Sequence, residues 1–226
     1  MPVRFSRTFA FLLTAAICAA APGCAIMQDL QNRQARAREE RERAELRKQA
    51  LAEHEVYRSL AGWKKQTYRN KELLSQATPE NVSLEISLSE QRGLLLVRTA
   101  VAMDFPVATG KKSHPTPAGS FTIRAKEKNY FSNLYGKIYD AQNVVVVSDA
   151  DSRTDAVPDG GRFEGATMPY WMRLTDTGVG MHVGYVPGRP ASHGCIRLKR
   201  DTAVQVFDLV KVGTPVVIAE TAPSLL

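Results

Sequence analysis

The sequence of 226 residues contains only three cysteines. Cys18 and Cys24 lie in or next to an N-terminal segment with the features of a leader peptide, so Cys195 is the single thiol beyond it. A fold held together by disulfide bonds is therefore excluded. An unpaired thiol outside the cytosol is exposed to oxidation, so its presence requires either burial or a chemical task.

The sequence also lacks a dense cluster of Lys and Arg with interleaved aromatic residues. That pattern is typical of nucleic-acid-binding surfaces, so nucleic acid is not expected as a partner. The net charge of +7 falls to +5 once Arg4 and Arg7 leave with the leader. This modest excess favours a polyanionic envelope or anionic lipid as the surroundings.

The apolar run from Phe9 to Ala21 is too short to span a bilayer comfortably. It follows Arg4 and Arg7, as in a secretory signal peptide. The next residues, Ala21-Pro22-Gly23-Cys24, resemble the lipobox at which a bacterial lipoprotein precursor is cut before a cysteine that then carries lipid. We expect residues 1–23 to be a lipoprotein-type signal peptide.

Lipidation of Cys24 predicts a membrane anchor. Ala25, rather than aspartate, follows this cysteine, so the expected location is the periplasm of a Gram-negative cell, with the anchor in the outer membrane. Cleavage after Ala19-Ala20-Ala21 by the ordinary signal peptidase is the alternative.

Glycine and proline are almost absent between residues 28 and 75, where only Gly62 interrupts a stretch of strong helix formers. Opposite charges recur at the four-residue spacing of a solvated helix in Glu39–Arg43, Arg36–Glu40 and Arg41–Glu45. Apolar residues gather in the second half, which suits packing on another surface, at Leu46, Ala50, Val56, Leu60 and Trp63. We expect residues 24–78 to be a charged helical spacer, a short coiled coil, or a helix that only connects.

After Thr78-Pro79 the pattern changes to an alternation of apolar and polar residues, which predicts strands. Candidate strands lie at 82–88, 94–97, 101–107, 121–123, 144–147, 172–174, 181–183 and 216–218. One helix is predicted from Asp201, its N-cap, to Lys211, with Gly213 ending it. Residues 79–220 are expected to form a mainly β domain, a curled mixed sheet or sandwich with one or two short helices, and 221–226 a tail.

The segment Ser192-His193-Gly194-Cys195 places a thiol beside an imidazole, and His182 precedes the cysteine by thirteen residues. A thiol becomes a nucleophile when a neighbouring histidine takes its proton, so the pattern predicts covalent cysteine catalysis. Residues 184–191 are rich in Gly and Pro and can fold back, which would let Cys195 begin a returning strand and face His182. We take His182 as the general base and expect it to depress the pKa of Cys195, while His193 is the alternative base or shapes the pocket.

Three neighbours of Cys195 have predicted roles. Gly194 leaves the backbone N–H groups of the turn open to stabilise an oxyanion. Arg197 is placed to hold a substrate carboxylate, or alternatively forms a structural ion pair. Ser192 is a further substrate-binding candidate, or only bonds the backbone of the turn.

A zinc site built from His182, His193 and Cys195 is disfavoured, because the sequence lacks paired ligands at short intervals. We expect no metal and no cofactor.

These residues resemble the signature of the L,D-transpeptidases of bacterial cell walls, the YkuD catalytic domain family. The signature is a histidine, a loop of variable length, then Ser/Thr-His-Gly-Cys, an apolar residue and Asn or Arg. It is matched by His182, Ser192, His193, Gly194, Cys195, Ile196 and Arg197. The resemblance covers roughly residues 80 to 220 and extends to the segments 108–110, 115–123, 168–174 and 213–218.

The resemblance implies a two-step acyl transfer. Cys195 would attack the bond between the third residue of a peptidoglycan tetrapeptide stem, usually diaminopimelate, and the terminal D-Ala, leaving a thioester. An amine on another stem, on a lysine of an envelope protein or on a free D-amino acid would then take the acyl group, giving a 3-3 crosslink in the first case. His182 would accept the thiol proton, with the backbone carbonyl just after it, that of Val183, orienting the ring.

Tyr170 and Trp171 are candidate pocket walls for the substrate, or alternatively core residues. Two other functions stay open at this point. One is a hydrolase on the same fold, in which water resolves the thioester, and the other is a non-catalytic scaffold that binds the cell wall.

Overall fold

The computed structural model describes residues 22–225, and side chains from residue 26 to 224. Residues 1–21 of the predicted signal peptide and the side chain of Cys24 therefore lie outside the described part. None of the described helices combines the length and the apolar character of a membrane-spanning segment. The chain divides into two units, with the boundary between Glu45 and Leu46.

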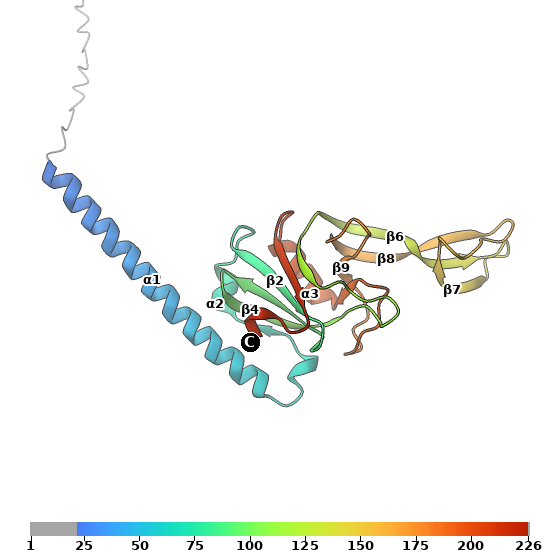
Figure 1. The fold of residues 1–226 in the computed structure, drawn as a ribbon, viewed down its shortest axis with the longest axis horizontal. Helices are drawn as coiled ribbons and strands as arrows, with labels where there is room; N and C mark the ends of the chain where they lie inside the picture. Colours follow the sequence, from blue (N-terminus) through green and yellow to red (C-terminus); the bar gives the residue numbers. More distant parts are fainter. Residues whose placement is uncertain (1–21, 226) are drawn as a thin grey trace, which may run out of the picture. The chain divides into compact units, whose positions relative to one another are not determined.

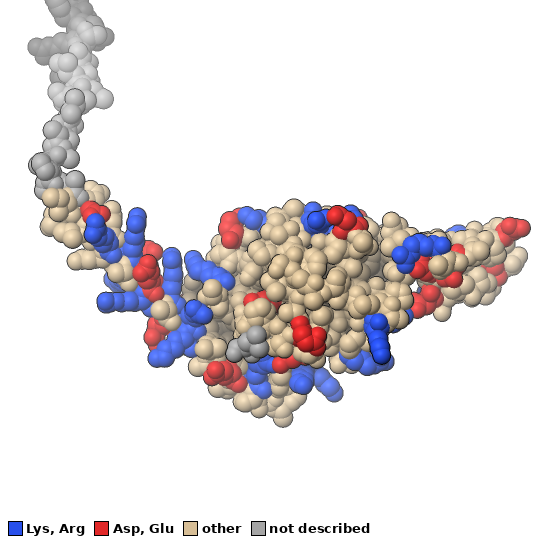
Figure 2. Space-filling model, in the orientation of Figure 1, with Lys and Arg blue, Asp and Glu red and all other residues tan. Residues whose placement is uncertain are grey.

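Helix α1 (Pro22–Ser59) confirms the charged helix that the sequence predicts. Its described side chains up to Glu45 are all exposed, and charges of both signs cover this stretch in Figure 2. Of the predicted pairs, Glu39–Arg43 is present at 3.4 Å. The other ion pairs of this described stretch are Asp29–Arg33 and Arg38–Glu42, both at 2.9 Å.

The last turns of α1 belong to the second unit and pack against the sheet, as the apolar residues there predicted. Ala50 is buried and Leu46 packs on the same core, whereas Val56 and Leu60 are exposed. The other buried side chains of α1 are those of His54 and Tyr57, which are polar or aromatic.

The prediction of helix up to residue 75 is wrong beyond Ser59. Gly62 has a φ of 75°, which an α-helix does not accommodate, and a short 3-10 helix η1 (Trp63–Lys65) and strand β1 (Tyr68–Arg69) follow. Helix α2 (Lys71–Ser75) then starts at Asn70, whose side chain accepts a hydrogen bond from Leu73 N at 2.8 Å.

The rest of the described chain forms the mainly β domain that the sequence predicts (Figure 1). The strands are β2 (Val82–Ser87), β3 (Arg92–Val97), β4 (Ala100–Ala108), β5 (Gly119–Thr122), β6 (Ala125–Tyr139), β7 (Val145–Asp151), β8 (Arg162–Arg173), β9 (Gly180–Val183), β10 (Ile196–Leu198) and β11 (Pro215–Ala219). With β1 on β4, they form a mixed sheet in the order β5-β11-β2-β3-β4-β10-β9-β8-β6-β7, in which β10–β9 and β11–β2 are the parallel pairs among the described strands. A short 3-10 helix η2 (Pro223–Leu225) closes the described chain.

The alternation predicted for β2 is confirmed, because Val82, Leu84 and Ile86 are all buried. Helix α3 (Arg200–Leu209) is also present, but its N-cap is Lys199 rather than Asp201, and Asp201 lies in the first turn instead. Its buried residues Ala203 and Val206 join the core formed by the sheet.

Strand β8 is much longer than the strand predicted at 172–174, and β6 was not predicted as a strand. Together with β7 they extend from the sheet as an arm, defined here as residues 132–167 (Figure 1). Most residues of β6 are exposed or only half-buried, so its side chains are not selected for alternating polarity. The arm positions one wall of the site described below.

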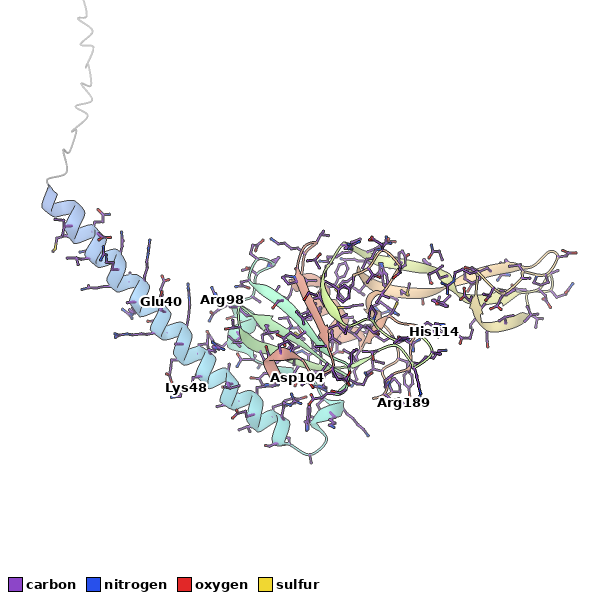
Figure 3. The ribbon with its side chains drawn as sticks, viewed as in Figure 1. Glu40, Lys48, Arg98, Asp104, His114 and Arg189 are labelled. Carbon is purple, nitrogen blue, oxygen red and sulfur yellow. The ribbon has the colours of Figure 1, made fainter. Side chains whose placement is uncertain are left out.

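A buried ionic network ties the last turns of α1 to β3 and β4. Asp104, which is labelled in Figure 3, is fully buried, and its carboxylate lies 2.8 Å from His54 Nε2 and 2.6 Å from Arg92 Nε. Arg92 also donates to the Tyr57 hydroxyl at 3.1 Å and to the carbonyl oxygens of Lys64 and Gln66. Every polar atom of this buried guanidinium thus depends on residues 57–66 or on Asp104.

Candidate active site

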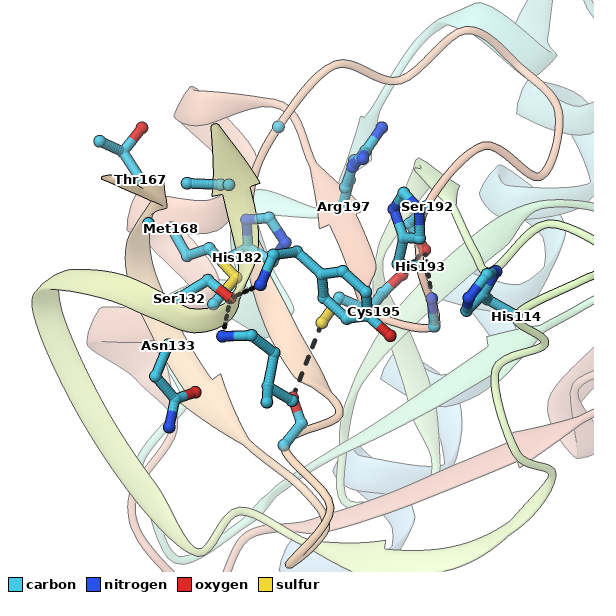
Figure 4. Close-up of a pocket in the computed structure, with 18 of the residues that line it drawn as sticks. His114, Ser132, Asn133, Thr167, Met168, His182, Ser192, His193, Cys195 and Arg197 are labelled. Atoms are coloured by element: carbon cyan, nitrogen blue, oxygen red, sulfur yellow. Dashed lines mark hydrogen bonds between the residues drawn. The ribbon is translucent and has the colours of Figure 1, made fainter. Parts of the chain in front are cut away.

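Cys195 lies at the end of a tight turn, one residue before β10 (Figure 4). Ser192 Oγ accepts a hydrogen bond from Gly194 N at 3.1 Å and donates to the carbonyl oxygen of Cys195. Thr116 Oγ1 donates to the carbonyl oxygen of Gly194 at 2.7 Å. Gly194 has a φ of 110°, which a residue with a side chain adopts only under strain. The turn is therefore held from both sides and requires glycine.

Strand register places the partners of Cys195. In the parallel pair of β9 and β10, Arg197 stands next to His182. The connection between these strands thus leads back to the same end of the sheet, and the returning strand β10 runs parallel to β9.

The thiol of Cys195 is protonated at neutral pH. Burial raises its pKa, while the backbone at Gly180 and the Arg197 charge act in the opposite direction. In the part of the chain that the structure describes, the thiol donates to the carbonyl oxygen of Gly178, with Sγ 3.8 Å away, and to no side chain. The depressed pKa expected from the sequence is therefore wrong for the resting protein.

His182 is buried, and burial lowers the pKa of its imidazole to about 4. Its Nδ1 lies 2.9 Å from the carbonyl oxygen of Val183. Because a carbonyl only accepts, the proton is on Nδ1, and Nε2 carries the lone pair. The resting pair is thus a neutral thiol and a neutral imidazole, which suits proton transfer during attack rather than before it.

His193 is held on the other side of Cys195. Its ring stacks on Tyr135 with centroids 4.6 Å apart and meets His114 edge-on at 4.7 Å. Lys111 Nζ donates to His193 Nε2 at 2.9 Å, and Asp149 Oδ2 lies 3.4 Å from the same nitrogen. Since Nε2 is already accepting from an ammonium, His193 is the poorer of the two bases.

A cavity of about 710 Å³ joins these groups. His182, Ser192, His193, Gly194, Cys195 and Arg197 all line it. None of the ion pairs among the described residues includes Arg197. Its side chain packs closely over Gly184, where an added Cβ would lie 2.8 Å from the Arg197 side chain. The guanidinium is thus positioned by packing and left available for a ligand.

Tyr170 and Trp171 do not line this cavity. Tyr170 packs edge-on against Phe207, with centroids 5.4 Å apart. Trp171 is buried, stacks on Tyr130 at 5.0 Å and lies 6.0 Å from the ring of His182. Trp171 can therefore support the position of the His182 ring, while a substrate contact of either residue stays a prediction.

The cavity wall formed by the arm was not predicted from the sequence. Residues of β6, β7 and β8 within the arm line the cavity at Ser132, Tyr135, Lys137, Asp149 and Glu164, and Tyr130 of β6 lines it just outside the arm. No motif marks these positions, and the only available signal was the location of 126–136 between predicted strands. Within the described residues, no group of three or more His, Cys, Asp and Glu is arranged to hold a metal ion.

The chain is similar in sequence to proteins of a known family. Residues 81–218 match the family model of the L,D-transpeptidase catalytic domain, YkuD. Probable L,D-transpeptidase 3 of Mycobacterium tuberculosis (strain ATCC 25618 / H37Rv) is 31% identical over 120 residues, which cover 51% of this chain and 38% of that protein. L,D-transpeptidase 1 of the same strain is 35% identical over 128 residues, covering 51% and 41%. The chain thus matches less than half the length of these curated relatives.

Solved structures are similar over a comparable part. An L,D-transpeptidase from Mycobacterium smegmatis has a TM-score of 0.47 and 27% identity, covering 62% of this chain and 58% of that chain. The structure of the L,D-transpeptidase LdtMt1 in complex with imipenem has a TM-score of 0.47 and 28% identity, covering 62% and 59%.

Proposed function

Since the chain belongs to the L,D-transpeptidase catalytic domain family, we propose that it is a cysteine-dependent acyltransferase that acts on peptidoglycan stem peptides. The observation that carries this proposal is the meeting of Cys195, a neutral His182 and an Arg197 without an ion-pair partner in one cavity of the described chain. A nucleophile, a base and an anion-binding group are what acyl transfer from a peptide with a free carboxyl end requires.

In the first step the sulfur of Cys195 attacks the carbonyl carbon of the third residue of a tetrapeptide stem. His182 Nε2 accepts the thiol proton as the C–S bond forms, and then gives it to the departing amine of D-Ala. The products are a thioester and free D-Ala. Gly194 N is bonded to Ser192 Oγ, so the backbone N–H of Cys195 is the better donor for the developing oxyanion.

Arg197 has a defined task in this step. Because it stands beside His182 in the β9–β10 register, a D-Ala whose amine faces His182 can direct its carboxylate to the guanidinium. The side chain thereby selects the end of a stem and aligns the bond to be broken.

In the second step an amine attacks the thioester from the position that D-Ala has left. His182 Nε2 removes a proton from the attacking nitrogen, and the thiol of Cys195 is released with a proton restored. The acceptor is another stem in a 3-3 crosslink, or an envelope protein. Intact nucleophile and base disfavour the non-catalytic scaffold.

We also propose that the protein acts in the periplasm, anchored to the outer membrane by lipid on Cys24. Labelled palmitate should be incorporated by the full chain and not by Cys24→Ser. Equal labelling of the two would overturn the anchor and leave the enzymatic proposal untouched.

The activity is tested by product analysis. The leaderless protein is incubated with disaccharide tetrapeptide and the products are separated by liquid chromatography and mass spectrometry. The proposal predicts dimers with loss of one D-Ala, absent with Cys195→Ala. Release of D-Ala without dimers or exchange, even with added amine, would identify a hydrolase instead.

A further inference from the structure

The loop between β4 and β5, residues 109–118, contacts the catalytic turn, defined here as residues 191–195. The carbonyl oxygen of Thr109 accepts hydrogen bonds from Ala191 N at 2.9 Å and from Ser192 N at 3.1 Å. The start of the turn is therefore held by the backbone of the loop, and these contacts do not depend on the side chains that the loop carries.

Thr116 holds the end of the turn with its side chain. Its buried hydroxyl accepts a hydrogen bond from Gly110 N at 2.8 Å and donates one to the carbonyl oxygen of Gly194 at 2.7 Å. Because a carbonyl oxygen only accepts, the hydroxyl proton points at Gly194, and Gly110 N bonds a lone pair of the hydroxyl. A side chain without a hydroxyl at position 116 would leave both backbone groups without this partner.

The position of Thr116 is fixed by the closure of its loop. His114 N donates to the carbonyl oxygen of Lys111 at 2.8 Å. A Cβ added at Gly110 would lie 2.0 Å from the carbonyl oxygen of His114 and 2.6 Å from Thr116 N, so the two ends of the loop approach as closely as only glycine allows. The Thr116 hydroxyl is therefore held in place before any substrate arrives.

The peptide group between Gly194 and Cys195 depends on Thr116 alone. Ser192 Oγ holds the peptide groups on either side of it, because it accepts from Gly194 N at 3.1 Å and donates to the carbonyl oxygen of Cys195. Within the described chain, no other protein group hydrogen-bonds to the carbonyl oxygen of Gly194 or to the N–H of Cys195.

This one hydrogen bond sets the direction of the Cys195 N–H. In a planar trans peptide the C=O and the N–H point in opposite directions. Because the Gly194 carbonyl is held toward Thr116, the N–H of Cys195 points away from Thr116. Gly194 and Cys195 line the cavity whereas Thr116 does not, so the N–H is directed into the cavity.

That direction matters when negative charge develops on the carbonyl oxygen of the substrate. A donor stabilises the charge best when it already points at the place where the charge appears. Gly194 has no side chain that restricts rotation of the peptide group that follows it, so the chain itself does not fix this donor. The hydrogen bond from Thr116 supplies the missing restraint.

Resting on the proposed function, we propose that Thr116 is a positioning residue for acyl transfer, whose hydroxyl fixes the Gly194–Cys195 peptide so that the Cys195 N–H stabilises the oxyanion. As the C–S bond forms, the electron pair of the substrate C=O moves onto its oxygen, and this N–H binds the charge. When the pair returns, the C–N bond breaks and the amine leaves with the proton that His182 took from the thiol. Thr116 itself touches neither substrate nor thiol.

Two reactions of the same thiol test this role. Acylation of Cys195 by disaccharide tetrapeptide passes through an oxyanion, whereas alkylation by iodoacetamide displaces iodide from a saturated carbon and forms none. Both rates are followed by intact mass on the leaderless protein, with alkylation at pH 9. A variant that only displaces the thiol slows both reactions, and a variant that misdirects the N–H slows acylation.

Thr116→Val removes the hydroxyl at nearly constant size. It should slow acylation about tenfold to hundredfold, up to the effect of losing an oxyanion donor, and leave alkylation within about twofold. Thr116→Ser keeps the hydroxyl and should bring acylation back to within about threefold of the native rate. If the valine variant melts below the assay temperature, Thr116→Ala takes its place in the same comparison.

Thr214→Val is the matched control. The buried Thr214 hydroxyl also accepts a hydrogen bond from a backbone amide, Lys211 N at 2.9 Å, but Thr214 does not line the cavity. This variant should lower Tm and change neither rate. Equal slowing of acylation and alkylation by Thr116→Val, unchanged acylation, or no rescue by Thr116→Ser would each overturn the positioning role.

Failure of the proposed function looks different, because the native protein would then not be acylated by the tetrapeptide. p-Nitrophenyl acetate replaces it as acyl donor in that case, since attack on this ester also passes through an oxyanion. The C–S bond forms, the C–O bond to p-nitrophenolate breaks, and the thiol proton leaves through His182 to solvent. Thr116→Val should slow acetylation of Cys195, corrected with Cys195→Ala, more than it slows alkylation, and equal slowing would overturn the role.

Discussion

Nδ1 of His182 lies 2.9 Å from the carbonyl oxygen of Val183, and this hydrogen bond decides which nitrogen of the ring can act as a base. The orienting group is backbone, so it does not depend on the identity of residue 183. Burial then keeps the ring neutral, since its pKa is lowered to about 4. The base is therefore ready at neutral pH without a carboxylate partner.

The first prediction concerns the acidic limb of the pH profile. Because the pKa of His182 is lowered to about 4, Nε2 stays unprotonated as pH falls from 7 to 5 and becomes protonated only near pH 4. The rate of acylation of Cys195 should accordingly persist at pH 5.5 and decline below about 4.5. A decline centred near pH 6.5, the ordinary value for histidine, would contradict the neutral buried base.

The second prediction concerns the resting thiol. Because burial raises the pKa of Cys195, alkylation by iodoacetamide should be slow at pH 7 and should still be rising above pH 9. A rate that is already at its plateau at pH 7 would show a preformed thiolate and would contradict the neutral pair.

The third prediction concerns the turn before the nucleophile. Gly194→Ala introduces a side chain at a φ of 110°, although the added Cβ would meet nothing closer than 3.8 Å. The cost is therefore backbone strain of about 1–3 kcal/mol, released by shifting the turn and Cys195 with it. Acylation should fall at least about tenfold, because reacting groups tolerate little displacement.

Gly188→Ala is the matched control for this change. Gly188 also has a positive φ, 81°, and open space around its Cβ position, but it does not line the cavity. It should lower Tm without a comparable loss of acylation. Equal losses of acylation in the two variants would show that the turn at Gly194 has no special role.

The fourth prediction concerns the contribution of α1 to the fold. A chain that starts at Pro79 deprives Arg92 of Tyr57 and two carbonyl oxygens, and Asp104 of His54. Unpaired buried groups cost about 1–3 kcal/mol each, which consumes most of a stability of about 5–15 kcal/mol. This chain should fail to unfold cooperatively in a circular dichroism melt, whereas one that starts at Leu46 should keep the Tm of the leaderless protein.

Point variants check the same network without truncation. His54→Ala should lower the free energy of unfolding by about 1–3 kcal/mol, because Asp104 loses a buried partner. Val56→Ala, two residues away and exposed, should change it by less than about 0.5 kcal/mol. Similar effects of the two would show that the network does not stabilise the domain.

The features of this protein that depend on neighbouring residues could be predicted from the sequence. The alternation in β2 follows from one strand burying one face, and the segment from Ser192 to Arg197 is contiguous. His182 was recoverable as well, because it precedes the turn by a short loop.

What the sequence did not reveal depends on contacts between distant segments. His54 and Asp104 are 50 residues apart, and nothing in either neighbourhood marks them as partners. The arm was missed because the exposed β6 lacks alternation, and Asp149 reaches His193 only through the β6–β7 pairing. The raised pKa of Cys195 likewise follows from burial, which the motif alone does not encode.

The thioester between Cys195 and a stem peptide can be observed by intact mass of the leaderless protein after brief mixing with disaccharide tetrapeptide. We expect an adduct equal to the donor minus D-Ala, absent in Cys195→Ala, that disappears faster when an amine acceptor is added. Release of D-Ala by the folded protein with no adduct on Cys195, or activity retained by Cys195→Ala, would show that Cys195 is not the nucleophile.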